Sequence, residues 1–498
     1  MRYLSGQAIL RSIMRMKHTL FLFLFAFLAA ETGLCQTAGA GPGSPHKPVV
    51  PAPRQLVYQQ QETIGFVHFT VNTFTDKEWG DGTESPQIFN PSAFSADQWA
   101  QTFKQAGLRT LILTAKHHDG FCLWPSRYTE HSVKNSPWKG GQGDMVGEVA
   151  EACRRAGVRF GIYLSPWDRH EPSYGTAGYN TYYLNQLREL LTNYGPIAEV
   201  WMDGAKGENA KDMEYDFEAW RALVRELQPD AVMFSDAGPD VRWIGNEKGF
   251  AGETCWSTMD KDKVTIGKAD PAYLNTGDPA GKDWVPGECD VSIRPGWFYH
   301  AAEDDKVKSV PELVDIYYKS VGRNGTLLLN VPPDRRGLLH ETDVARLTGF
   351  KTVLDETFGT DLAAGKQATA TSTLTGSAFF NPGNLFDGRD NSYWSPEDTA
   401  TQPSVTVDLG GNVTFDRASL GEAVRFGQKV GAFALEAMVK GKWQTLAEGT
   451  TIGYKRLLRF KPVKARWVRL TIRESLGTPV LSELGLYQAA KGEAKAGK

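Results

Sequence analysis

The stretch Val200-Trp201-Met202-Asp203-Gly204 places a carboxylate directly after an apolar run. The run predicts a buried strand that ends at Met202, with Trp201 two positions before the acid. In barrels of parallel strands, catalytic groups lie at the carboxyl ends of the strands. Asp203 is therefore the first candidate for a catalytic carboxylate, and a turn residue in an Asp-Gly pair is the alternative interpretation.

Polar side chains recur at other predicted strand ends. His68 follows Gly65-Phe66-Val67, His117-His118-Asp119-Gly120 follows Leu111-Ile112-Leu113, and the segment from Tyr163 to Trp167 follows Val158 to Ile162. Several polar and aromatic groups that converge from separate strand ends predict a sugar-sized pocket.

Short apolar runs alternate with segments of helical period over residues 56–360. The predicted strands are Gly65–Val71, Arg109–Ala115, Val158–Leu164, Ala198–Met202, Ala231–Phe234, Ala251–Cys255 and Gly325–Asn330, and the predicted helices are Ala96–Ala106, Met145–Ala156, Tyr182–Tyr194, Asp216–Leu227 and Val310–Val321. This alternation predicts an α/β fold of the (β/α)8 (TIM) type. The helical period weakens between Gly238 and Lys308, so we expect an irregular barrel in which a full eighth repeat is not guaranteed.

The pattern changes after Ala363 to short alternating stretches without a long helix. The stretches are Ser404–Leu409, Ala432–Val439, Trp443–Ala447, Lys455–Phe460 and Ala465–Ile472. They predict a C-terminal β-sandwich over residues 365–490.

Length and composition agree with two domains and a neutral partner. A chain of 498 residues exceeds one ordinary core, and a net charge of -3 without a dense basic cluster argues against nucleic acid and a membrane surface as partners. The 14 Trp residues suit stacking on sugar rings as well as core packing.

The N-terminus predicts export. Basic residues precede the apolar stretch Leu20 to Ala30, so residues 1–35 read as a signal peptide too short for a membrane span. Thr32-Gly33-Leu34-Cys35 loosely resembles a lipoprotein processing site, although Leu34 stands where a small residue is expected. The product is then periplasmic or extracellular, with cleavage by an ordinary signal peptidase or a lipid anchor on Cys35 as alternatives, and residues 36–55 form a linker.

Cleavage of a glycosidic bond uses two carboxyl groups, and Asp203 needs a partner that protonates the leaving oxygen. The candidates are Glu247 and Glu288, both in the loop-rich region after the Asp203 strand and both near a Trp that can raise the carboxyl pKa by desolvation. Each of them alone also fits a solvated loop carboxylate.

Three further motifs concern binding. His117 and His118 are adjacent, so on a strand they point to opposite faces and do not chelate one metal; we interpret them as neutral hydrogen-bonding groups for sugar hydroxyls. Glu78-Trp79 pairs a carboxylate with an aromatic plane in the loop after the first strand. The cysteines Cys122, Cys153, Cys255 and Cys289 form no Cys-x-x-Cys pair, and we expect buried free thiols rather than zinc ligands.

Taken together, His68, Glu78-Trp79, His117-His118, Tyr163 and the Trp201-x-Asp203 strand end resemble the α-L-fucosidases of glycoside hydrolase family 29. The resemblance spans about Leu56 to Phe358 and includes Gly325-Thr326-Leu327-Leu328-Leu329-Asn330. It implies a retaining, cofactor-independent exo-fucosidase with Asp203 as nucleophile. His68, Glu78, Trp79, His117, His118, Tyr163, Trp201 and Trp297 would then bind fucose.

The position of the acid/base varies within this family. The segment Gly245-Asn246-Glu247-Lys248-Gly249 resembles the subgroup that acts on α-1,3- and α-1,4-linked fucose in Lewis-type glycans. Glu288 lies closer to the position used by broad-specificity members. The resemblance therefore favours Glu247 and the narrower linkage preference, with Glu288 and broad specificity as the alternative.

The C-terminal part resembles discoidin-type or family 32 carbohydrate-binding modules through the segment from Asn384 to Trp394. In such modules an Asp-Gly-x-Asp loop and a distant Glu hold a structural Ca²⁺, which implies a site at Asp387, Asp390 and Glu483. A plain β-turn is the alternative.

Two other function classes stay open at this point. One is a catalytically inactive, lectin-like fucose-binding protein on a decayed barrel, and the other is a glycosidase of the same architecture that cleaves a different sugar such as galactose. The intact Asp203, together with Glu247 and Glu288, argues against the inactive protein.

Overall fold

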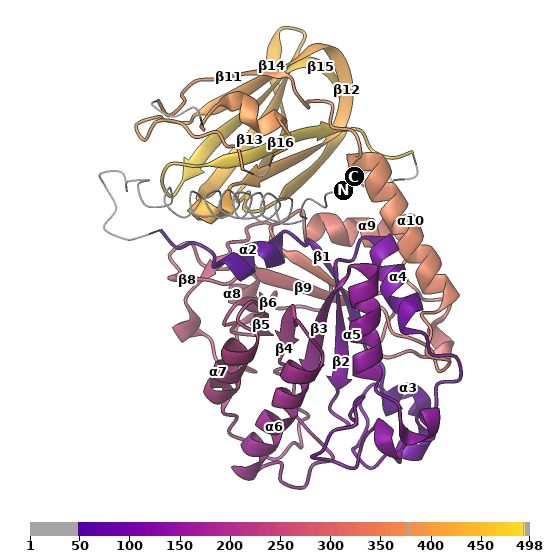
Figure 1. The fold of residues 1–498 in the computed structure, drawn as a ribbon. Helices are drawn as coiled ribbons and strands as arrows, with labels where there is room; N and C mark the ends of the chain where they lie inside the picture. Colours follow the sequence, from indigo (N-terminus) through magenta and orange to yellow (C-terminus); the bar gives the residue numbers. More distant parts are fainter. Residues whose placement is uncertain (1–47, 376–378, 390, 492, 494–498) are drawn as a thin grey trace, which may run out of the picture. The chain divides into compact units, whose positions relative to one another are not determined.

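The computed structural model describes residues 48–375, 379–389, 391–491 and 493 (Figure 1). The expected signal peptide, its Cys35 and most of the expected linker lie outside this range. Helix α2 (Pro53–Gln59) already begins inside the segment 36–55, because Pro53 occupies the first helical turn, where its missing N–H costs nothing. None of the helices in the described ranges is long and apolar enough to cross a membrane.

Eight parallel strands close into a barrel, which confirms the predicted fold class. In spatial order they are β1 (Thr63–Val67), β10 (Thr326–Asn330), β9 (Gly287–Ser292), β6 (Val241–Trp243), β5 (Val232–Ser235), β4 (Glu199–Trp201), β3 (Arg159–Leu164) and β2 (Thr110–Lys116). The chain runs through them in order around the ring, as in other (β/α)8 barrels. The ring of eight strands is complete, but the barrel is irregular as expected: no helix separates β5 from β6, and the segment between β6 and β9 carries only short elements.

Helices cover the outside of the barrel. They are α4 (Ala96–Ala106), α5 (Met145–Ala156), α6 (Gly178–Asn193), α7 (Phe217–Leu227), α9 (Val310–Lys319) and α10 (Glu341–Phe358), with the short α3 (Val71–Thr75) and α8 (Pro271–Thr276) in loops. The helices α4 and α5 have the predicted bounds, because Ser95 and Asp144 accept from backbone N–H groups at their starts.

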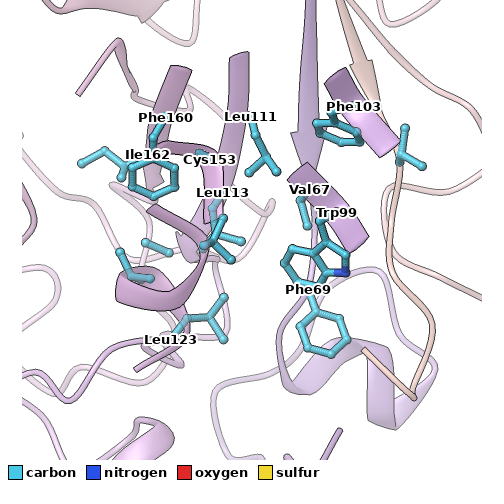
Figure 2. Packing of buried hydrophobic residues seen from close by; sticks show 14 of the residues in the cluster. Val67, Phe69, Trp99, Phe103, Leu111, Leu113, Leu123, Cys153, Phe160 and Ile162 are labelled. Atoms are coloured by element: carbon cyan, nitrogen blue, oxygen red, sulfur yellow. The ribbon is translucent and has the colours of Figure 1, made fainter. Parts of the chain in front are cut away.

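The larger core lies between strands and helices. Figure 2 shows Trp99 and Phe103 of α4 and Cys153 of α5 beside outward-facing side chains of β1 to β3. A Cβ atom at Gly65 would lie 2.2 Å from the Phe103 ring. Glycine at this position in β1 therefore lets α4 approach the barrel closely.

Inside the barrel, a second cluster comes from the alternate side chains of the same strands. It contains Ile64, Phe66, Ile112, Tyr163, Trp201, Val232, Phe234, Val241 and Leu328, with Tyr58 of α2. Trp201 stacks on Phe234 with ring centroids 4.0 Å apart. The strand-end residues lie next to this interior layer, toward the carboxyl ends of the strands.

Several elements differ from the sequence predictions. The segment Ala251–Cys255 is not a strand; only its ends, Ala251 and Cys255, are buried, and they pack in a loop with Ile244 and Cys289. The strands β6 and β9 and the helix α10 were not predicted. The inward side chains of β9 are polar, and α10 buries few apolar side chains, so neither shows the expected hydrophobic pattern.

The C-terminal domain is an antiparallel β-sandwich, as predicted. Its strands are β11 (Gln367–Ala370), β12 (Ser404–Glu422), β13 (Val430–Val439), β14 (Lys442–Gly449), β15 (Arg456–Ser475) and β16 (Leu481–Tyr487). The two predicted strands Lys455–Phe460 and Ala465–Ile472 are parts of the single long strand β15. The pairing of β12 with β15 has register shifts, which let both strands bend and continue.

Candidate active site

Asp203 lies just beyond β4, at the carboxyl end of the barrel. Tyr163 Oη donates to its Oδ2 at 2.9 Å, and the backbone N–H of Ala205 donates to its Oδ1 at 2.8 Å. Burial raises the pKa of Asp203, while these two donors act in the opposite direction. The side chain keeps 21% exposure, so the structure holds this carboxylate in a fixed position that a substrate can still reach.

His68 and His118 are neutral, with the proton on Nδ1. His68 Nδ1 lies 2.9 Å from Asn330 Oδ1, and the Asn330 amide donates to Ser292 and to the Trp297 backbone, so its oxygen accepts from the ring. Burial lowers the pKa of His68 to about 3. Its Nε2 therefore carries a free lone pair, which can accept a hydrogen bond from a sugar hydroxyl.

His118 has the same tautomer as His68, with its proton on Nδ1 and a free lone pair on Nε2. Its Nδ1 lies 2.7 Å from Ser165 Oγ, and that hydroxyl donates to the Trp167 carbonyl. Burial lowers the pKa of His118 to about 3. Its Nε2 lies 3.6 Å from Asp203 Oδ2, so two acceptors face each other and a ligand hydroxyl can donate there.

The neighbouring His117 is also buried, and its ring stacks on Tyr163 at 5.6 Å. Burial, followed by the nearby His118 and His68, lowers its pKa well below the ordinary value. His117 thus belongs to the same group of neutral rings at the ends of β1 to β3.

Glu78 holds the loop that carries Trp297. Its carboxylate accepts from the backbone N–H groups of Trp297 and Phe298 at 2.9 and 3.1 Å, and it lies 2.7 Å from His300 Nε2. His300 is in turn 2.9 Å from Asp76. In this structure Glu78 therefore connects the loop after β1 to the loop after β9, in addition to the sugar contact expected from sequence.

Two indole rings flank the group. Trp79 is 45% exposed and meets His118 edge-on, with ring centroids 5.5 Å apart. Trp297 lies 5.2 Å from the His68 ring. Their partly exposed faces can contact the apolar side of a sugar.

Glu247 lies on the loop after β6, and Trp297 Nε1 donates to its carboxylate at 3.3 Å. Partial burial of the carboxyl, followed by the negative charges of Asp203 and Glu78, raises the pKa of Glu247. The loop itself is ordered by Asn246, whose amide bonds the Phe250 carbonyl and the Lys248 N–H. A carboxyl that keeps its proton beside a second carboxylate is suited to general acid catalysis.

Glu288 does not lie in a loop, contrary to the prediction. It is on β9, points into the barrel and is 0% exposed. Its two oxygens accept from Tyr58 Oη at 2.6 Å and from Trp201 Nε1 at 2.8 Å. The sequence of β9 does not read as a strand because polar residues occupy its inward positions. Glu288 therefore supports the Trp201 ring from inside the barrel.

One strand-end residue was not singled out from the sequence. Asp236 follows β5, and its Oδ2 accepts from the Gly267 N–H at 2.7 Å. A Cβ atom at Gly204 would lie 2.8 Å from this carboxylate, so the glycine after Asp203 leaves room for it. The strand-end rule that selected Asp203 also applies to Asp236, which follows the predicted strand Ala231–Phe234 by two residues.

The proposed calcium site is not supported. Asp387 accepts from Ser392 and from the Arg389 N–H, while Glu483 lines a cavity of about 760 Å³ together with Glu62 and Lys455 at the opposite end of the barrel strands. Asp390 lies outside the described residues. Within the described ranges, no three His, Cys, Asp or Glu side chains are grouped to hold a metal ion. Asp387 and Glu483 have different neighbours because β16 directs Glu483 toward Lys455.

The chain is similar to known fucosidases over most of its length. It matches the family "Alpha-L-fucosidase" over residues 54–356 and the F5/8 type C domain over residues 367–483. It is 50% identical to putative alpha-L-fucosidase 1 of Oryza sativa subsp. japonica over 456 residues, which is 91% of this chain and 88% of the relative. It is 47% identical to alpha-L-fucosidase 1 of Arabidopsis thaliana, over 94% of this chain and 93% of the relative.

Solved structures agree. The Ruminococcus gnavus GH29 fucosidase in complex with fucose has 38% identity and a TM-score of 0.84, and the match covers 90% of this chain and 98% of that one. A putative alpha-L-fucosidase from Bacteroides thetaiotaomicron has 43% identity and a TM-score of 0.84, over 90% and 99%. With its closed barrel, its strand-end carboxylate and its discoidin-like C-terminal domain, the chain belongs to the α-L-fucosidases of glycoside hydrolase family 29.

Proposed function

We propose that this α-L-fucosidase removes terminal α-1,3- and α-1,4-linked L-fucose from branched, Lewis-type glycans by double displacement with retention. Asp203 attacks the anomeric carbon and forms a fucosyl ester while Glu247 gives its proton to the leaving oxygen. Glu247, now ionised, then takes a proton from water as the water cleaves the ester.

The observation that carries this mechanism is the contrast between the two carboxyl groups. Asp203 receives two hydrogen bonds that favour its ionised form. Burial raises the pKa of both carboxyls, but Glu247 accepts only the longer bond from Trp297 and is also affected by the negative charges of Asp203 and Glu78, which favour its protonated form. Two neighbouring carboxyls whose pKa values are set differently suit a nucleophile and an acid.

The remaining site residues support binding of a deoxyhexose. The free Nε2 atoms of His68 and His118 accept from hydroxyls, while Trp79 and Trp297 offer ring faces. We assign His117, Tyr163 and Trp201 to the same pocket, with Glu78 fixing the Trp297 loop. Glu288 is not favoured as acid/base because both its oxygens are bonded inside the barrel.

The linkage preference rests on the segment from Gly245 to Gly249. Both glycines have positive φ, 86° and 73°, so the segment makes a tight turn with Glu247 near its tip. A Cβ atom at Gly245 would lie 2.4 Å from the Pro271 carbonyl oxygen. The turn therefore packs against α8, which gives the acid a defined position for a branched substrate.

We also propose export to the periplasm or the cell exterior. The support is the basic and apolar N-terminal segment of residues 1–35. Mass spectrometry of the mature N-terminus would distinguish ordinary cleavage from a lipid on Cys35; an intact Met1 terminus on the exported protein would contradict the signal peptide.

Linkage and mechanism are tested with the purified protein. A Lewis-type trisaccharide should be hydrolysed much faster than an α-1,2-fucosylated one, and equal rates would contradict the linkage preference. Proton NMR of the first product should show the α-anomer of fucose; initial release of the β-anomer would overturn retention.

The residues are tested separately. Asp203→Ala should lower kcat by orders of magnitude with an unchanged melting temperature, because the side chain stands at the rim of the barrel and contributes little to its core. Glu247→Ala should lose about 10²- to 10⁴-fold and recover with azide. Azide rescue of Glu288→Ala, with none for Glu247→Ala, would reverse the assignment of the acid/base.

A further inference from the structure

The strand β9 carries a file of three polar side chains that point into the barrel: Glu288, Asp290 and Ser292. The side chains between them, Cys289 and Val291, pack outward in apolar clusters. This alternation follows from the two-residue period of a strand. The interior below the site is therefore polar along this one strand.

Two of the three inward side chains have partners. Glu288 accepts from Tyr58 and Trp201, and Ser292 Oγ donates to the Gly296 carbonyl at 2.7 Å. Asp290 is 2% exposed, and its Oδ1 is buried without a hydrogen-bond partner in the described part of the chain. A buried polar atom without a partner is costly, so Asp290 Oδ1 is available for a hydrogen bond with a bound ligand.

Four other carboxyl groups affect the pKa of Asp290. Glu288 lies two residues before it on the same strand, and Glu247, Asp203 and Asp236 act on it from the strand ends. Burial, followed by these four carboxyls, raises the pKa of Asp290 well above the ordinary value, which favours its protonated form. Asp290 is thus close enough to both reacting carboxyls for their charges to affect its pKa.

A protonated carboxyl adds a donor to a site in which most of the polar groups are acceptors. His68 Nε2, His118 Nε2 and the carboxylates of Asp203 and Asp236 are acceptors, and the Tyr163 hydroxyl already donates to Asp203. A sugar hydroxyl donates once and accepts as well. A neutral Asp290 can donate to such a hydroxyl oxygen and accept in return.

We propose that Asp290 is a further substrate-binding residue, whose carboxyl group hydrogen-bonds one hydroxyl of the fucosyl residue from inside the barrel. The proposal rests on the proposed function, because fucose must occupy the site of Asp203 and Glu247. It distinguishes Asp290 from Glu288, whose oxygens are already bonded to protein groups.

The test pairs variants with substrate analogues. Values of kcat/KM are measured for wild type, Asp290→Ala and Asp290→Asn with 4-nitrophenyl α-L-fucoside and with its 2-, 3- and 4-deoxy analogues. For the hydroxyl that Asp290 contacts, the deoxy substitution should cost wild type about tenfold more than it costs Asp290→Ala. Asp290→Asn retains a donor and an acceptor, so it should keep more activity than Asp290→Ala and serves if the alanine variant does not fold.

Val291→Ala is the matched control, because it destabilises the same strand from its outward face. Its losses should add to the deoxy effects for every analogue. If the losses of both Asp290 variants were also additive for all three analogues, Asp290 would have a structural role and this proposal would be overturned. If wild type released fucose neither from the parent fucoside nor from the Lewis-type trisaccharide, the proposed function would fail first.

Discussion

Replacing Tyr163 by Phe isolates one hydrogen bond to the proposed nucleophile. The Tyr163 hydroxyl donates to Asp203 Oδ2 at 2.9 Å, and it can do so fully only while the carboxyl is ionised. A hydrogen bond to a charged group contributes about 1.5 to 3 kcal/mol, and about 1.4 kcal/mol corresponds to one pKa unit. Since Asp203 is 21% exposed, water replaces part of this bond, and we expect the lower end of the range.

The Tyr163→Phe variant should change the pH dependence of the reaction in one direction. Losing a donor to the ionised form raises the pKa of Asp203, so the acidic limb of the kcat/KM profile should move up by about one pH unit. The profile is measured with 4-nitrophenyl α-L-fucoside from pH 3 to 8. Tyr194→Phe is the matched control, because Tyr194 donates to Asp144 at 3.0 Å at the start of α5, away from the site. An unshifted acidic limb in Tyr163→Phe, or an equal shift in the control, would refute the reasoning.

Three other changes have defined outcomes. Glu78→Gln removes an acceptor for the N–H groups of the Trp297 loop and should raise KM about tenfold with a smaller change in kcat. Asp81→Asn, in the loop that carries Glu78, should leave KM unchanged. Equal KM values for the two variants would contradict a role of Glu78 in holding the Trp297 loop. Lys116→Met removes the ion-pair partner of the buried Asp168 carboxylate, which lies 2.7 Å from the Lys116 ammonium group, and should lower the free energy of unfolding in urea by about 3 to 5 kcal/mol. A loss below about 1 kcal/mol would show that the ion pair is dispensable. Burial raises the pKa of Asp119 to about 7, so between about pH 4 and 7 the folded state holds a proton that the unfolded state releases. The contribution of the Asp119 carboxyl to the free energy of unfolding should therefore fall as pH rises through this range. Asp119→Asn should remove that part of the slope in denaturation curves between pH 4 and 8, and an unchanged slope would be inconsistent with it.

Local signals explain which elements were predictable. The helices α4 and α5 have a side-chain cap at one end and a glycine with positive φ at the other, Gly107 at 80° and Gly157 at 73°. Both signals lie within the helix and its flanking residues. Such elements are predictable because their ends depend on neighbours in the sequence.

The strand β9 shows the opposite case. Its sequence Gly-Glu-Cys-Asp-Val-Ser reads as a loop, because acids occupy the positions that face the barrel interior. Only the partners Tyr58 and Trp201, 230 and 87 residues away in sequence, make burial of Glu288 tolerable. Sequence reasoning therefore placed Glu288 in a loop and did not identify Asp290.

The amino-acid sequence alone was sufficient for the barrel class, the sandwich and the position of Asp203 at a strand end, because strand ends and hydrophobic periods are local properties. Residue spacing left both Glu247 and Glu288 open and only the family resemblance favoured Glu247, since the environment of each carboxyl depends on which one lies near Asp203 and which is enclosed. Those facts follow from the closure of eight strands into a ring, which brings residues far apart in the chain within hydrogen-bonding distance. Burial and side-chain direction, and with them the pKa of each acid, exist only once that ring has formed.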